Sequence, residues 1–304
     1  MRGYVANTDY EWFTFLRERA PWEEVNFWQP SGGTAFRVIP PGSPVIFRLK
    51  APHNRIAGFG WFVRHVVSED WAAWDAFGQA NGAPDFPAMR ERIARYRRGG
   101  VTGPARIGCL MLGDPVFFPP AAAIADPLDW KPNIVRGKGY DLTTGEGARI
   151  WAECRERAGL MGAIPPGDEA PGRFGTPLTV TPRLGQGSFR MAVTEAYAGA
   201  CAVTGEHSLP VLDAAHIRPY GDGGEHRTPN GLLLRTDLHR LFDRGYVTVT
   251  PGHMLRVSRA LRDDYANGAS YYPFDGRPIH LPGDPADRPD PALLEWHGDE
   301  VFRG

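Results

Sequence analysis

The most informative part of the chain is LDAAHIRPYGDGGEHRTPNGLLLRTDLHRLFDRG, residues 212–245. It contains three histidines, one asparagine and four aspartates, and a loop rich in glycine separates two short apolar runs. The first run ends near His216, and the second, residues 231–235, precedes a helical pattern over 237–244 that Gly245 ends. The stretch therefore predicts the order strand, loop, strand, helix.

The polar residues of this stretch suggest a hydrolytic site. His239 and Asp243 are four residues apart, so they share a helix face and form half of a mixed nitrogen and oxygen metal site, although the same spacing is typical of an ion pair. His216, at a strand end, has the chemistry of a general base that activates water. Arginines that would contact neighbouring phosphates are Arg218, Arg235 and Arg240. These residues predict metal-assisted hydrolysis of a phosphodiester.

The segments AHI, NGL, LH and FDRG occur here in that order, and as a run they resemble the HNH endonuclease family over about residues 181–260. The resemblance implies a ββα-metal fold. It also implies that His216 is the general base, that Asn230 braces the loop and orients His216, and that His239 and Asp243 are metal ligands. The loop residue His226 is expected to be solvated.

The chain departs from the family pattern at one position. Many members place an acidic residue or a histidine directly before the catalytic histidine, and here Ala215 occupies that place. Asp213 shares the strand face of Ala215, so it either replaces the missing ligand or pairs with an arginine. The expected cofactor is a divalent metal, Mg²⁺, Mn²⁺ or Ni²⁺. Paired cysteines of a structural zinc site are missing, since only Cys201 is nearby.

The N-terminal part reads as a compact set of short strands. Runs at 43–50, 55–67 and 106–118 are rich in Val, Ile and Phe with Gly and Pro between them, and a Trp-rich helical run follows the second. This order resembles the PUA superfamily, and EVE domains in particular, which implies a β-barrel with helices that reads modified bases. Within such a domain the expected pocket residues are Asn26, Trp28 and Trp74.

The whole chain is thus expected to be an α+β protein of two domains. The expected divisions are a base-recognition domain over 1–140, a helix and Pro/Gly linker over 141–180, and a nuclease domain over 181–304. Together they predict an endonuclease of the type IV restriction class that cuts double-stranded DNA near 5-methylcytosine or 5-hydroxymethylcytosine. A homodimer is expected, because cleavage of both DNA strands requires two active sites. The alternatives are an inactive modified-DNA binding protein, a nuclease indifferent to modification, and a reader of modified RNA.

Composition limits the remaining classes. A net charge of −1 does not identify a nucleic-acid binder, so phosphate contact would depend on local arginines. The three cysteines are far apart, which excludes a disulfide framework. No apolar run approaches the ~20 residues of a membrane span, and the first residues lack a signal-peptide pattern. The expectation is a cytoplasmic protein without a membrane partner.

Overall fold

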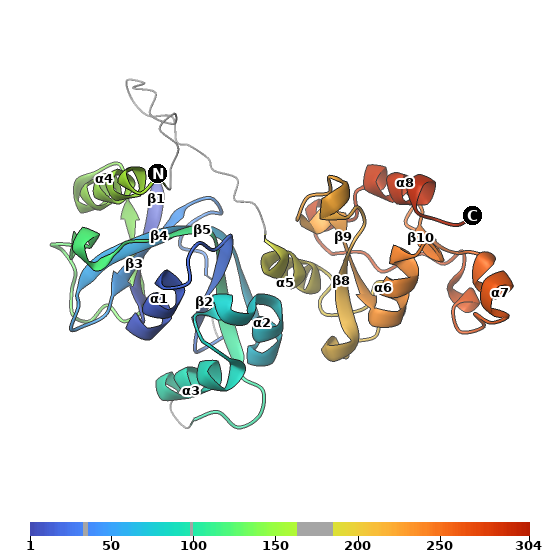
Figure 1. The fold of residues 1–304 in the computed structure, drawn as a ribbon, viewed down its shortest axis with the longest axis horizontal. Coiled ribbons are helices and arrows are strands. Elements are labelled where there is room, and N and C mark those ends of the chain that lie inside the picture. Colours follow the sequence, from blue (N-terminus) through green and yellow to red (C-terminus); the bar gives the residue numbers. More distant parts are fainter. Residues whose placement is uncertain (33–35, 98–99, 163–184) are drawn as a thin grey trace, which may run out of the picture. The chain divides into compact units, whose positions relative to one another are not determined.

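The computed structural model describes residues 1–32, 36–97, 100–162 and 185–304, which form two compact units, Met1–Ser188 and Phe189–Gly304. Part of the expected linker, residues 163–180, lies outside the described residues. The structure is a mixed α+β protein (Figure 1). None of the described helices is long and apolar enough to cross a bilayer.

The first unit is built on one mixed sheet with the strand order β2-β5-β4-β3-β1-β7, and β6 pairs with β4. The strands are β1 Arg2–Thr8, β2 Glu24–Gln29, β3 Pro44–Leu49, β4 Arg55–Glu69, β5 Arg106–Phe117, β6 Ile124–Ala125 and β7 Gly137–Asp141. The helices are α1 Tyr10–Arg17, α2 Asp70–Phe77, α3 Phe86–Tyr96 and α4 Gly145–Leu160. The three strands expected near 43–50, 55–67 and 106–118 are confirmed as β3, β4 and β5.

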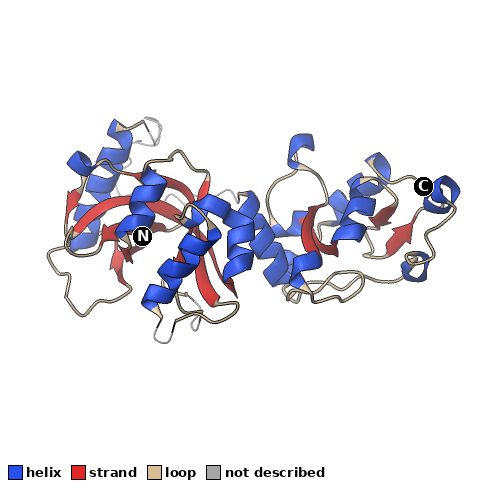
Figure 2. Ribbon diagram, turned by 60° about the horizontal axis from the view of Figure 1, so that its bottom comes forward, coloured by secondary structure: helices blue, strands red, loops and turns tan. Residues whose placement is uncertain are grey.

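The described strands form an open sheet that ends in β2 and β7, so they do not close into the expected barrel. The sheet instead buries both faces under helices. Ile46 packs in one cluster with Trp151 of α4, whereas the ring of its neighbour Phe47 lies 5.6 Å from that of Trp12 in α1. Successive strand residues face opposite sides, so α4 and α1 cover opposite faces. Figure 2 shows the continuous sheet of this unit between helices.

Helix α4 belongs to the core of the first unit. Its buried residues Ile150, Trp151, Cys154 and Ala158 pack with sheet residues such as Val5 and Phe59. This helix was expected to belong with the linker over 141–180, and it instead packs against the sheet. An amphipathic helix buries its apolar face where a sheet face is open to it, and local sequence does not reveal that packing.

The second unit contains residues 212–245, the stretch with three histidines and four aspartates. Its elements are the greater part of α5 Gln186–Ala196, then β8 Leu212–His216, β9 Gly231–Arg235, α6 Thr236–Asp243, β10 Val247–Val249, β11 Leu255–Val257, α7 Ala260–Tyr265 and α8 Pro291–Glu300. The predicted strand, loop, strand and helix are confirmed as β8, the loop, β9 and α6. Antiparallel pairing places His216 opposite Gly231.

Helix α6 ends where the sequence indicated. Gly245 has a φ of +74°, the left-handed conformation that glycine adopts without strain after a helix. A side chain there would also meet the carbonyl oxygen of Val301. The apolar side chains of α6, Leu238 and Phe242, are buried in a core shared with β9, so the polar side of α6 is left for other contacts.

Candidate active site

His216 lies at the end of β8 and is half-buried between two other rings. The ring of Phe189 stacks on it with a centroid separation of 3.8 Å and an angle of 13°. Phe189 has room there because residue 231 is glycine, since a Cβ at Gly231 would lie 3.0 Å from the Phe189 ring. The close packing across β8 and β9 thus holds the imidazole of His216 in a defined plane.

The other contact of His216 is with a second histidine. Its Nε2 lies 2.9 Å from Nδ1 of His226, which is in the loop between β8 and β9. Burial, followed by the neighbouring His226 and His239, lowers the pKa of His216 to about 4. The imidazole is therefore neutral near pH 7, which is the form in which a histidine accepts a proton.

Asn230 is fully buried and ties the loop together. Its Nδ2 donates to the carbonyl oxygens of Arg218 and Glu225, and its Oδ1 accepts from the backbone N–H of Arg218, each at 2.9 Å. These three bonds join Arg218, near the start of the loop, to Glu225 and Asn230 in its second half, which also contains His226. The geometry is what a loop brace requires, and it fixes the backbone directly before His226.

His239 lies between two carboxylates. Its Nδ1 is 3.3 Å from Oδ2 of Asp213 on β8, and its Nε2 is 3.4 Å from Oδ2 of Asp243, one turn further along α6. The pKa of Asp243 is raised, first by burial and then by the negative charge of Asp213, although His239 acts in the opposite direction. The structure thus brings together all three residues expected to bind metal.

The donor set fits a divalent cation in its chemistry, although the donors do not converge on one point. Across the described ranges, no three His, Cys, Asp or Glu side chains are arranged as a ready metal-binding group. One imidazole and two carboxylates are nevertheless the ligands that Mg²⁺, Mn²⁺ and Ni²⁺ accept between them. A ligating histidine commonly uses one nitrogen for the metal and the other for a carboxylate. His239 has a carboxylate at each nitrogen, so either nitrogen could take the metal while the other stays paired with a carboxylate.

The three arginines expected at phosphates differ in how they are engaged. Arg235 forms two hydrogen bonds with the carboxylate of Asp237, at 2.6 and 2.7 Å. Arg218 donates to the carbonyl oxygen of Asp222, and its guanidinium lies 5.1 Å from the ring centroid of Trp296. Arg240 is exposed on α6, one residue after His239. Arg240 is therefore the most available of the three for a phosphate.

The first unit contains a cavity of about 540 Å³. It is lined by aromatic rings and by polar or charged side chains, among them Trp12, Phe27, Trp28, Tyr96, Asn7, Asp9, Lys50 and Arg136. The Asp9 carboxylate accepts a hydrogen bond from the Tyr96 hydroxyl, and the Lys50 Nζ lies 4.2 Å from the Tyr96 ring centroid. A flat ring with hydrogen-bonding edges is the kind of ligand that such a lining suits.

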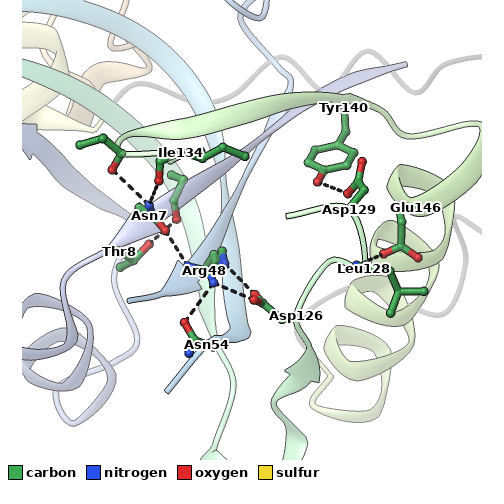
Figure 3. Close-up of polar contacts among 12 residues, drawn as sticks. Asn7, Thr8, Arg48, Asn54, Asp126, Leu128, Asp129, Ile134, Tyr140 and Glu146 are labelled. Atoms are coloured by element: carbon green, nitrogen blue, oxygen red, sulfur yellow. Dashed lines mark hydrogen bonds and ion pairs between the residues drawn. The ribbon is translucent and has the colours of Figure 1, made fainter. Parts of the chain in front are cut away.

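One wall of this cavity is held by the network in Figure 3. Asn7 donates to the carbonyl oxygens of Ile134 and Val135 and accepts from the buried Arg48. Arg48 in turn forms two hydrogen bonds with the Asp126 carboxylate, at 2.6 and 2.7 Å. The side chain of Asn7 is thus largely committed to the fold, and it is a rigid part of the cavity wall.

Of the three expected pocket residues, only Trp28 lines this cavity. Asn26 is fully buried, and its Nδ2 donates to Oδ1 of Asn81. The Trp74 ring packs near Phe86 of α3, with a centroid separation of 6.3 Å. The structure therefore does not place Asn26 or Trp74 at the cavity.

One residue of the candidate active site was not predicted. His226 was expected to be solvated, whereas it lies against His216 and stacks on Tyr220 with a centroid separation of 4.9 Å and parallel rings. A glycine-rich loop with a single histidine gave no spacing signal for this contact. The tight turn that folds the loop back depends on Gly224, where a Cβ would lie 1.9 Å from the Arg218 carbonyl oxygen.

The candidate active site lies in the part of the chain that matches a known protein family. Residues 201–250 match the family model described as HNH endonuclease, and this segment contains His216, Asn230, His239 and Asp243. The match supports a nuclease domain. A search of curated proteins finds no match.

Two solved structures are similar at low identity. One is a mutant of the ZmASCH protein from Zymomonas mobilis, 10% identical, covering 49% of this chain and 96% of that chain with a TM-score of 0.32. The other is the modification dependent TagI restriction endonuclease, 15% identical, covering 98% of this chain and 81% of that chain with a TM-score of 0.30.

Proposed function

We propose that this protein is a metal-dependent DNA endonuclease that hydrolyses phosphodiester bonds near a modified cytosine, 5-methylcytosine or 5-hydroxymethylcytosine. The observation that carries the nuclease part is a neutral, half-buried His216 in the same small unit as the group formed by His239, Asp213 and Asp243. A base and a cation site beside each other are what phosphodiester hydrolysis needs.

The chain's own residues supply the following roles. His216 accepts a proton from the attacking water, and Phe189 holds its ring in place. Asn230 keeps the loop closed around the site. His239, with Asp213 and Asp243, would hold a divalent cation, which when bound stabilises the negative charge that develops on the phosphate. Arg240 binds a neighbouring phosphate of the DNA backbone.

The cavity of the first unit supports recognition of a base. A flipped base can stack on aromatic rings such as Trp28 and Tyr96, and stacking contributes about 1–3 kcal/mol per base against an unstacking cost of a few kcal/mol. The Asp9 carboxylate would accept a hydrogen bond from the exocyclic amine of cytosine. Cutting of both strands then requires two active sites, for which a homodimer is the simplest arrangement.

The test is digestion of plasmids that contain cytosine, 5-methylcytosine or 5-hydroxymethylcytosine with Mg²⁺, Mn²⁺ or Ni²⁺ in turn. We expect cleavage only of a modified plasmid, with a loss of about 100-fold or more in His216→Ala. His207→Ala is the matched control, because His207 is an exposed histidine of the same unit. Equal cleavage of all three plasmids would support the nuclease activity and contradict its dependence on a modified base.

A second candidate is a modified-DNA binding protein without catalysis. It is favoured by Ala215, which occupies the family's usual ligand position, and by the donors around His239, which do not converge. Binding of modified DNA without nicking in any of the three metals would support this candidate. Metal-dependent nicking that is lost in His216→Ala would exclude it.

A further inference from the structure

The loop between β8 and β9 brings a second imidazole to the proposed base. We infer that His226 is a positioning residue, which holds His216 in the tautomer that can accept a proton from water. The inference rests on the proposed nuclease function. Its basis is the 2.9 Å contact between His216 Nε2 and His226 Nδ1, together with the surroundings of the two rings.

A neutral imidazole has one protonated and one unprotonated nitrogen, so a hydrogen bond between two neutral imidazoles fixes both tautomers. If His216 donates from Nε2, its Nδ1 is unprotonated and can act as a base. If His226 donates instead, Nδ1 of His216 carries the proton and cannot. The direction of the hydrogen bond at Nε2 therefore decides whether Nδ1 of His216 can accept a proton.

The other nitrogen of His216 is open. Within the described part of the chain, Nδ1 of His216 has no hydrogen-bond partner, and it is not one of the buried polar atoms that lack one, so it reaches solvent. The nitrogen turned to His226 is occupied by that contact, and the nitrogen turned away is open to water. Donation from Nε2 to His226 is the arrangement that leaves a free lone pair on the Nδ1 that water reaches.

His226 is itself held in place from two sides. Its ring stacks on Tyr220 with centroids 4.9 Å apart and an angle of 5°. Asn230 bonds the carbonyl oxygen of Glu225, the residue directly before His226. A residue merely solvated in a loop would not have both constraints, so the acceptor Nδ1 has a defined position relative to His216.

The proton and the electron pairs balance in the step that this arrangement allows. An O–H bond of water breaks and its proton goes to Nδ1 of His216, while the oxygen lone pair forms the new bond to phosphorus. One ester P–O bond breaks, and the leaving oxygen takes a proton from solvent. His216 becomes an imidazolium, and its Nε2–H stays hydrogen-bonded to His226 Nδ1, which stabilises the positive charge.

Three substitutions separate positioning from simple packing. His226→Asn puts an amide oxygen near the place of Nδ1 and keeps the acceptor. His226→Gln is the matched control, because its longer chain carries the amide towards the place of Nε2. His226→Phe keeps a ring for Tyr220 to stack on and has no acceptor. We expect kcat for nicking of modified plasmid to fall roughly 10- to 100-fold in Gln and Phe and much less in Asn, with KM unchanged.

A second measurement does not depend on nuclease activity. Long-range ¹H–¹⁵N spectra of the full chain at neutral pH distinguish protonated from unprotonated ring nitrogens, and His216→Ala identifies the signals of His216. We expect the Nε2–H tautomer in the wild type and in His226→Asn, and a mixture of tautomers in His226→Phe.

An Nδ1–H tautomer of His216 in the wild type would overturn the inference, and so would equal kcat in the wild type and in His226→Phe. A wild type that nicks no plasmid in any metal would instead overturn the proposed function, while the spectra would still report the tautomer. Equal loss in Asn and Gln would show that His226 only packs, and would also overturn the inference.

Discussion

Replacement of Asn230 by alanine is expected to open the loop between β8 and β9 while the rest of the second unit stays folded. The side chain is fully buried and forms three hydrogen bonds, all at 2.9 Å and all to backbone groups of the loop. Alanine removes every one of them and leaves two carbonyl groups and one N–H without their partner.

The magnitude follows from these three bonds. A typical intramolecular hydrogen bond contributes about 1 kcal/mol net, and a buried group left unsatisfied costs roughly 1–3 kcal/mol. Water can reach the backbone groups once the loop opens, so the lower figure applies to each bond, and the closed loop loses about 3 kcal/mol. That corresponds to an increase of roughly 100-fold in the population of the open loop.

Hydrogen–deuterium exchange measures the opening at the amide of Gly224, whose N–H donates to the carbonyl oxygen of Pro219 and keeps that acceptor when Asn230 is replaced. We expect exchange there to be roughly 100-fold faster in Asn230→Ala, with amides of β9 and α6 little changed. Asn230→Asp is the control of equal size, because it keeps the acceptor for Arg218 and loses both donated bonds. Unchanged exchange at Gly224 would refute the bracing role, and equal loss of protection across β9 and α6 would show that Asn230 supports the whole unit.

Three further results are expected. Gly231→Ala places a methyl group 2.4 Å from Val193 and should destabilise the second unit by about 1–3 kcal/mol in urea unfolding, whereas an unchanged midpoint would mean that the packing there is loose. Burial lowers the pKa of His297 from 6.5 in the unfolded chain to about 4 in the folded protein. Below pH 6.5 the unfolded chain gains a proton that the folded protein does not, so the free energy of unfolding decreases as the pH falls towards 4. The free energy of unfolding should decrease by about 2 kcal/mol between pH 7.5 and pH 5, and His297→Gln should lack this pH dependence. Titration calorimetry with Mn²⁺ should show roughly 10-fold weaker binding in both Asp213→Asn and Asp243→Asn, and normal affinity in both would remove these carboxylates from the metal site.

The local order of the second unit could be predicted from sequence because its signals are local. Apolar runs of strand length, a loop of Gly and Pro, and Gly245 after a helical pattern set the bounds of β8, β9 and α6. The contact between Asp213 and His239 agrees with this order of elements, since Asp213 is on β8 and His239 is on the helix that directly follows β9, the strand paired with β8.

The first unit shows what local sequence does not contain. Strand β1 pairs in parallel with β3 and antiparallel with β7, and these partners are far apart in the chain. Such pairings depend on which faces can be buried together, so the strands were predictable and their open sheet was not. Asn26 was expected at the base pocket, yet its amide donates to Asn81 inside the fold.

The two halves of the proposed site have opposite electrostatic needs, and the fold separates them. The negative charge of two carboxylates helps hold a cation beside His239, whereas carboxylates beside a general base would favour its protonated form. His216 escapes this effect because Phe189 and the loop bury it, so its pKa is already low without any cation nearby. Asp213 and Asp243 instead face His239. A cation bound there would lower the pKa of His216 further, and the base would remain ready throughout binding.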